Sequence, residues 1–110
     1  MAASTSKFTK RNRARLRQLA GEAWEAELER ELEVLFEHFG TWAESGLNAF
    51  ELSDLIHDFH NGISRELYAR YTTLPPTITV PRAVALGILG EADVGSELLQ
   101  KLTSEIEMYR

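Results

Sequence analysis

Hydrophobic residues recur with a helical period over the first part of the chain. They are spaced by four, three, four and three residues, which places them on one face of a helix. The members of this stripe are Leu28, Leu32, Leu35, Phe39 and Trp42, with Ala20 and Trp24 extending it toward the N-terminus. We predict a first helix over 9–45 that buries this stripe and ends at Gly46, with Gly21 and Gly40 as alternative kink positions.

A second apolar stripe follows a helix-start signal. Asn48 and Glu51 have the spacing of a capping box, and the stripe that follows runs from Leu52 to Leu67. It crosses Asn61-Gly62, where the helix either kinks or runs through, and ends near Tyr71. Because the loop before Asn48 is short, the two helices should form an antiparallel hairpin.

The stretch TTLPPTITVPR, residues 72–82, changes the pattern. Three prolines within seven residues disfavour a helix, so we predict an extended strap across the hairpin. Pro81 would open a short buried helix that ends at Gly90, and a last amphipathic helix is predicted over 94–109. The predicted fold is therefore all-α, with four to five helices: a long N-terminal helical hairpin, a Pro-rich strap and two shorter C-terminal helices.

Length and composition suit one small domain. The chain has 110 residues, 44% of them hydrophobic, and we predict a disordered N-terminus over 1–8 and a single helical domain over 9–110. It has no cysteine, which excludes disulfides and thiolate metal sites and suits a reducing, cytoplasmic setting. No apolar run approaches the ~20 residues of a membrane span, so no membrane contact is expected.

Charge is unevenly distributed, although the net charge is only −5. Residues 7–17 carry six basic side chains and no acid, whereas residues 22–37 carry seven glutamates and one arginine. The basic arm, Lys7–Arg17, could bind a nucleic-acid backbone, or it could be a solvated, frayed terminus. Because most of the apolar stripe begins later, removal of residues 1–17 is expected to leave the fold intact.

A polar cluster is predicted inside the hairpin. On a helical wheel, several charged side chains fall on the flanks of the two apolar stripes, and the antiparallel register brings them level. These are Glu27, Glu31, His60, Glu66 and Arg70. We expect a structural network, because near-core charges usually pair with each other. The alternative is a small helical-bundle enzyme or metal-binding protein that uses Glu27, Glu31, His60 and Glu66, with catalytic candidates His60, Glu66, Arg70 and Glu31.

The histidines are the weaker candidates for a metal site. His57 and His60 are three residues apart and could share one ion, with Asp54 or Asn61 as the third ligand. Bundle metal sites use a Glu-x-x-His from each of two helices, and this chain has only Asp54-x-x-His57. We therefore favour no metal and expect no cofactor.

The stretch FHNGISRELYARY, residues 59–71, resembles a family of small uncharacterised bacterial helical proteins. In that family a Phe-His, a Gly and an Arg-Glu-Leu-aromatic run stand at this spacing. The resemblance extends over residues 48–71 and the end of the first helix. It implies a bacterial, cytoplasmic protein and no particular activity.

The first helix is longer than the predicted fold can cover. At 1.5 Å per residue it would reach ~54 Å, against a diameter of roughly 35 Å for a compact chain of this size. A second apolar edge, made by Leu19, Ala23, Ala26 and Val34, would then pack against another protein, most simply as an antiparallel homodimer through the first helix. We therefore favour an interaction or assembly module over an enzyme.

Overall fold

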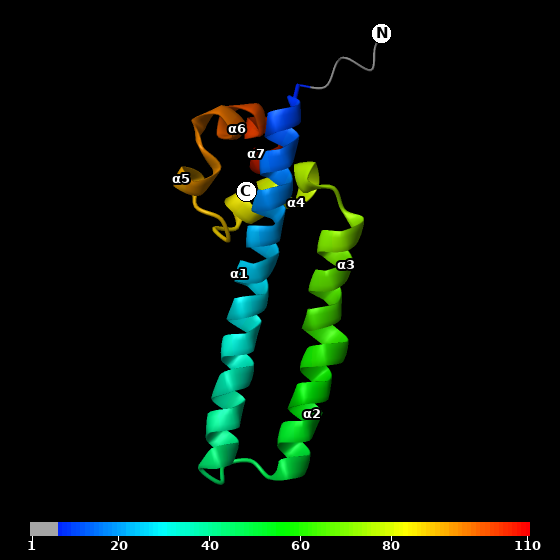
Figure 1. Ribbon diagram of the computed structural model, residues 1–110. Helices are drawn as coiled ribbons and strands as arrows, with labels where there is room; N and C mark the ends of the chain where they lie inside the picture. The colour runs from blue at the N-terminus through cyan, green and yellow to red at the C-terminus, as the bar shows by residue number, and fades with distance from the viewer. Residues whose placement is uncertain (1–6) are drawn as a thin grey trace.

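A computed structural model describes residues 7–110 of the chain, which are mostly helical and contain no strand (Figure 1). The all-α prediction is confirmed. In chain order the elements are α1 Lys10–Ala43, α2 Ala49–Phe59, the π-helical turn η2 His60–Ser64, α3 Arg65–Thr73, α4 Pro76–Ala85, α5 Glu91–Val94, α6 Ser96–Lys101 and α7 Thr103–Glu107. The predicted antiparallel hairpin is present, with α1 as one arm and α2, η2 and α3 as the other.

Helix α1 begins and ends with specific caps. Thr9 and Asn12 form a reciprocal capping box at its start. The helix runs through Gly21 and Gly40 and closes with a Schellman motif, in which Ser45, not Gly46, takes the left-handed conformation (φ 68°). Gly46 is needed for a different reason, because a Cβ there would lie 2.7 Å from Thr41 Cγ2.

The second arm runs continuously through Asn61-Gly62. The predicted capping box is confirmed, since the Asn48 side chain accepts a hydrogen bond from the Glu51 backbone N–H and the Glu51 carboxylate accepts one from Asn48. The turn η2 has i→i+5 hydrogen bonding, which fits one additional residue into the helix. The side chains of α3 are therefore rotated about the helix axis by ~100°, the rotation of one residue, from where a regular α-helix would place them.

The predicted extended strap over 72–82 is wrong, because most of that stretch belongs to α4. Pro75 has an extended backbone at the N-cap, and Pro76 occupies the first helical position, where a missing N–H has no consequence. Only Pro81 lies inside the helix, and its ring is among the fully buried side chains. Burial of the ring thus offsets the hydrogen bond that Pro81 cannot donate.

The predicted helix over 94–109 is also wrong as a single element. Gly95 has φ 92° and ψ 151°, a conformation suited to glycine, and separates α5 from α6. A second break at Leu102 separates α6 from α7. Leu98, Leu102 and Ile106 nevertheless pack into one core beside the start of α1. The short helix predicted to run from Pro81 to Gly90 also has other bounds, since α4 begins at Pro76 and ends at Ala85.

The hydrophobic core lies at one end of the molecule. It comprises Leu16, Leu19, Ala23, Val80, Ala83, Val84, Leu89, Val94, Leu98, Leu102 and Ile106. The rest of the hairpin projects beyond it, so the molecule measures 63 × 26 × 23 Å with a radius of gyration of 18.0 Å, against about 13 Å for a compact chain of this length (Figure 1). The core therefore uses the first half of α1, not the stripe over 28–42.

The described residues that precede and begin α1 are docked onto this core. Of the predicted disordered segment 1–8, residues 1–6 lie outside the described residues. Lys7 forms an ion pair with Glu105 (3.0 Å), and Phe8 packs against the core. Leu16, within the basic arm, is only 1% exposed. These contacts argue against the expectation that residues 1–17 can be removed without loss of the fold.

Candidate functional site

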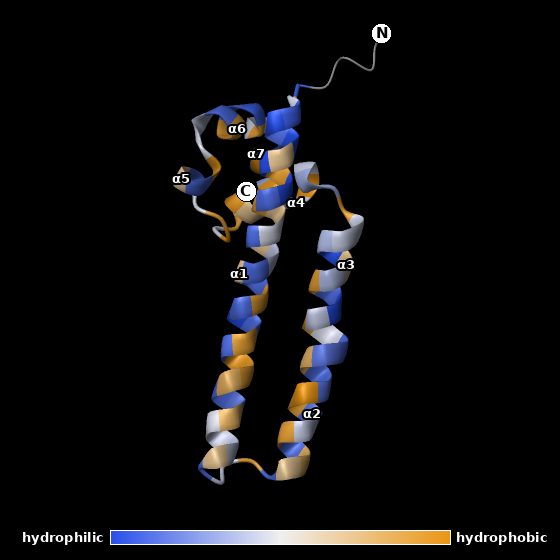
Figure 2. Ribbon diagram, in the orientation of Figure 1, coloured by the Kyte–Doolittle hydropathy of each residue, from blue (hydrophilic) through white to orange (hydrophobic). Residues whose placement is uncertain are grey.

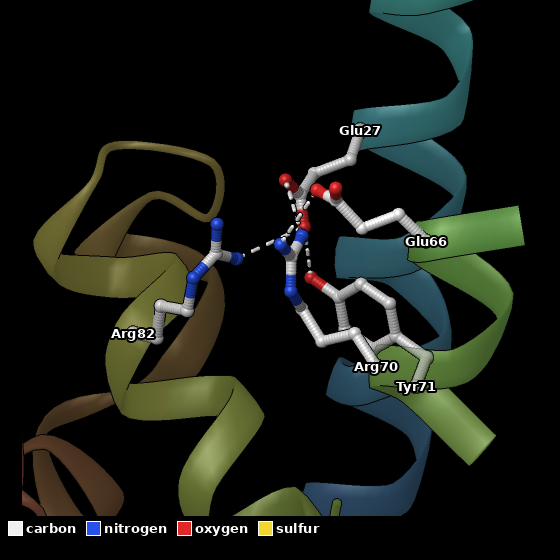
Figure 3. A network of polar contacts seen from close by, with 5 residues as sticks. All are labelled: Glu27, Glu66, Arg70, Tyr71 and Arg82. Carbon is white, nitrogen blue, oxygen red and sulfur yellow. Dashed lines mark hydrogen bonds and ion pairs between the residues drawn. The ribbon is translucent and has the colours of Figure 1, made fainter. Parts of the chain in front are cut away.

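The first candidate is a network of polar side chains between the hydrophobic core and the part of the hairpin that projects beyond it (Figure 3). Glu27 of α1 lies at its centre. Its carboxylate accepts hydrogen bonds from Arg70 (3.4 Å) and Tyr71 (2.5 Å) of α3 and from Arg82 of α4 (3.1 Å). Arg70 also pairs with Glu66 one turn earlier (3.2 Å). The network thus ties α1 to the consecutive helices α3 and α4, about 40 to 55 residues further along the chain.

The network is closed and balanced in charge. Two guanidinium groups face two carboxylates, and the Glu27, Arg70 and Arg82 side chains are mostly buried, at 14%, 20% and 22% exposed. Burial, followed by the hydrogen bond to Glu27, raises the pKa of Tyr71 above its usual range. Tyr71 therefore stays protonated and acts as a hydrogen-bond donor. This arrangement suits a structural joint, since both oxygens of Glu27 already accept hydrogen bonds from the protein.

The structure brings together part of the predicted cluster. Glu27, Glu66 and Arg70 meet as expected, but Glu31 lies in a shallow hollow with His38, and His60 is exposed. Sequence reasoning missed Tyr71 and Arg82. Tyr71 was missed because the π-helical turn η2, which brings it onto the face toward α1, was not predicted. Arg82 was missed because the prolines concealed that residues 76–85 form a helix.

The metal candidates do not converge. Asp54, His57 and His60 are all exposed on the second arm. Within residues 7–110, no group of three or more histidine, aspartate or glutamate side chains is arranged to hold a metal ion.

The basic arm is folded, since Lys10–Arg17 form the first turns of α1. Asn12 is buried, donates to Glu97 (3.1 Å) and accepts from Lys101 (2.8 Å), while Arg15 donates to the Asp93 carbonyl. The hydrogen bond from Asn12 lowers the pKa of Glu97. These contacts hold the arm against α5 and α6, so the predicted frayed terminus is wrong for residues 10–17.

The second candidate is the part of the hairpin beyond the network, residues 28–63, which we call the distal hairpin. Leu52 is its single buried side chain. Half of the exposed large hydrophobic side chains of the described chain lie in it: Leu32, Val34, Phe36, Phe39, Trp42 and Phe50. Phe36 and Phe50 are 77% and 84% exposed, and apolar bands alternate along this end of both arms in Figure 2. Exposed apolar surface of this density is typical of a protein-binding face.

The predicted dimer edge is partly wrong. Leu19 and Ala23 are fully buried in the chain's own core, whereas Val34 is exposed. The open apolar surface of α1 is instead the outer part of its main stripe, above all Leu32 and Phe39.

No family model, no curated protein and no solved structure matches this chain. The resemblance of residues 59–71, and the bacterial setting it implies, stay predictions. In the part of the chain that the structure describes, no helix combines the length and hydropathy needed to span a bilayer.

Proposed function

We propose that this protein is a cytoplasmic helical assembly module that associates with itself through the distal hairpin. The observation that carries the proposal is the separation of roles along α1. Its first half buries Leu16 and Leu19 in the chain's own core, whereas its second half exposes Leu32 and Phe36. A two-helix hairpin with one buried side chain is poorly stable by itself, and pairing with a second copy would complete a four-helix arrangement.

The alternative of a small enzyme or metal-binding protein has less support. Its proposed residues, Glu27, Glu31, His60 and Glu66, do not share one site, because His60 is exposed and Glu27 is saturated by contacts within the network. Nucleic-acid binding by the basic arm also has less support. Lys7 and Arg15 are already engaged by Glu105 and by the Asp93 carbonyl.

Light scattering at micromolar concentration tests the proposal. The full chain should give a mass of about 25 kDa, twice the 12.5 kDa of one chain. The double variant Leu32→Gln, Phe36→Gln should be monomeric with unchanged helicity. Leu86→Gln is the matched control, since Leu86 is equally exposed (51%, against 45% for Leu32) but follows α4, and this variant should remain dimeric. A monomeric wild-type chain at all concentrations would overturn the proposal.

A further inference from the structure

We infer that the distal hairpin binds a basic amphipathic helix of another protein, on the face turned away from Leu32 and Phe36. The site is the hollow beside Glu31 and His38, which we call the hairpin groove. This inference goes beyond the proposed self-association, because it concerns a different face of the hairpin and a different partner.

The hairpin groove has an apolar floor built by both arms. Its volume is about 240 Å³, and it extends along α1 from Glu31 to His38 and along the second arm into η2. Five hydrophobic side chains line it: Val34, Leu35, Leu55, Phe59 and Ile63. All five are at least partly exposed, and Val34 is 49% exposed. The floor is therefore open to an apolar partner.

The groove and the stripe assigned to self-association lie on different sides of α1. Val34 is two residues from both Leu32 and Phe36, which places it ~160° round the helix from each of them. A partner helix can thus occupy the groove while a second copy of the chain covers Leu32 and Phe36.

The acidic side chains of the distal hairpin have no basic partners within the described chain. Residues 28–63 carry eight acidic side chains and one basic one, and none of the eight forms an ion pair in the structure of residues 7–110. Elsewhere in the chain, seven of the nine acidic side chains are paired. Arg30 donates to the Gly87 carbonyl (3.3 Å) and so does not neutralise its neighbours. The distal hairpin therefore has a net charge of −7, which favours a basic partner.

Several of these acidic side chains border the groove. Glu31 of α1 and Asp58 of α2 belong to its wall. Asp54 and Glu51 precede Asp58 by four and seven residues, so they continue the same acidic edge along α2. An occupant with an apolar face and with lysine or arginine on its flanks would therefore match the floor and the edges together.

The walls of the groove favour a helix as the occupant. Both walls are helical, so their backbone N–H and C=O groups are hydrogen-bonded within each arm, and an extended segment would find no backbone partners there. A helix satisfies its own backbone and binds such grooves through apolar residues at i, i+3, i+4 and i+7. The distance from Glu31 to His38 is about two turns of α1, which matches this spacing.

A second copy of the chain does not offer such a helix. Its strongly basic helical segment is the start of α1, where Leu16 is 1% exposed and faces the chain's own core. The apolar side of that segment is already covered, so the occupant is a different protein.

Fluorescence anisotropy with a synthetic peptide tests the inference. The probe is a helical peptide of about 18 residues, with leucine at i, i+3, i+4 and i+7 and lysine on both flanks of the leucine face. It should bind the full chain at one site per chain, and binding should weaken as salt rises, because exposed charges are screened. Two control peptides should not bind: one with glutamate in place of each lysine, and one with the same composition in scrambled order.

Matched variants of the protein locate the site. Val34→Gln should weaken binding of the lysine peptide at least about tenfold, whereas Leu32→Gln, at a similar exposure (45% against 49%), should leave it unchanged. Asp58→Lys should also weaken binding at least about tenfold. Glu29→Lys makes the same change in charge ~140° round α1 from Val34 and should weaken binding less than about threefold. The four altered residues are exposed, so helicity should not change.

The outcomes separate this inference from the proposed function. Absence of binding, equal binding of the glutamate peptide, or undiminished binding by Val34→Gln and Asp58→Lys would overturn the inference. Loss of binding in Leu32→Gln with binding retained in Val34→Gln would place the peptide on the other face and would overturn it as well. A monomeric wild-type chain that still binds the peptide in the groove would overturn self-association and leave the inference standing.

Discussion

Deletion of Gly62 should be tolerated, although deletions inside helices are usually disruptive. Removing one residue from an α-helix turns everything beyond it by ~100° and shifts it by 1.5 Å. In this chain the turn η2 already contains one residue too many for an α-helix. Loss of Gly62 should convert η2 into a regular α-turn and leave Leu67 and Tyr71 facing α1 as before.

The matched perturbation is deletion of Ala69, an exposed residue of α3. It lies between Leu67, which is 1% exposed, and the Arg70–Tyr71 pair. After its deletion these two groups cannot both face α1, so Glu27 loses two of its three partners. Breaking a buried ion pair costs about 3–5 kcal/mol, and the partial exposure of this network argues for the lower figure, about 3 kcal/mol. Deletion of Gly62 should change stability by no more than about 1 kcal/mol, because glycine is itself unfavourable in a helix.

Thermal unfolding followed by circular dichroism distinguishes the two deletions. A loss of about 3 kcal/mol should lower the Tm of a domain this small by roughly 10 °C or more, whereas deletion of Gly62 should move it by only a few degrees. Urea titration of the same variants gives the free energies of unfolding directly. If both deletions destabilise equally, the additional residue of η2 does not set the phase of α3, and the explanation for the position of Tyr71 must be abandoned.

Other parts of the fold give further predictions. Glu27→Ala should lower the free energy of unfolding by about 3 kcal/mol in urea titrations, whereas Glu66→Ala, at a side chain 62% exposed, should lower it by under about 1 kcal/mol. The raised pKa of Tyr71 gives stability that is complete below its ordinary value of 10.0 and is lost as the pH rises above it. Unfolding at about pH 9 and pH 11 should therefore show a smaller loss in Tyr71→Phe than in the wild type, and an equal loss would contradict this. Among the described residues, the buried Thr79 hydroxyl has no hydrogen-bond partner, so Thr79→Val should raise the midpoint in urea by an amount equivalent to about 1 kcal/mol. Removal of residues 1–17 should abolish the helical circular dichroism signal of the core, and a fully helical truncated chain would refute the docked arm.

Local signals in the sequence were sufficient for the hairpin. The Asn48–Glu51 capping box depends on residues three apart, so it can be read from the chain and was confirmed. The strap failed because the pattern did not distinguish prolines at a helix start, such as Pro75 and Pro76, from one inside a helix. The position of a proline within a helix, and the burial of its ring, depend on contacts with residues far away in sequence.

The composition of the core and of the polar network likewise depends on contacts between residues that are distant in sequence, which the sequence pattern does not show. The regular stripe over 28–42 was taken for the core, but an apolar stripe indicates a helix face and does not say which chain covers it. The buried apolar residues of 80–106 belong to several short helices, and the apolar pattern did not show the breaks between them. Glu27 could be placed by register, whereas Arg82 could not, because its helix was assigned as a strap.

The docking of α1 onto α6 and α7 has a consequence for synthesis on the ribosome. Asn12 meets Glu97 and Lys101, and Leu16 shares a core with Ile106, so these contacts close only after residue 106 has been made. At ~5–20 residues per second, the stretch from 74 to 106 takes roughly 2–6 s, whereas helices form in microseconds. The hairpin segment is therefore synthesised first, and its helices can form with the apolar stripe exposed before the core is complete. On the proposed self-association, neighbouring nascent chains on one messenger would meet through that stripe, and assembly would precede the completion of each subunit.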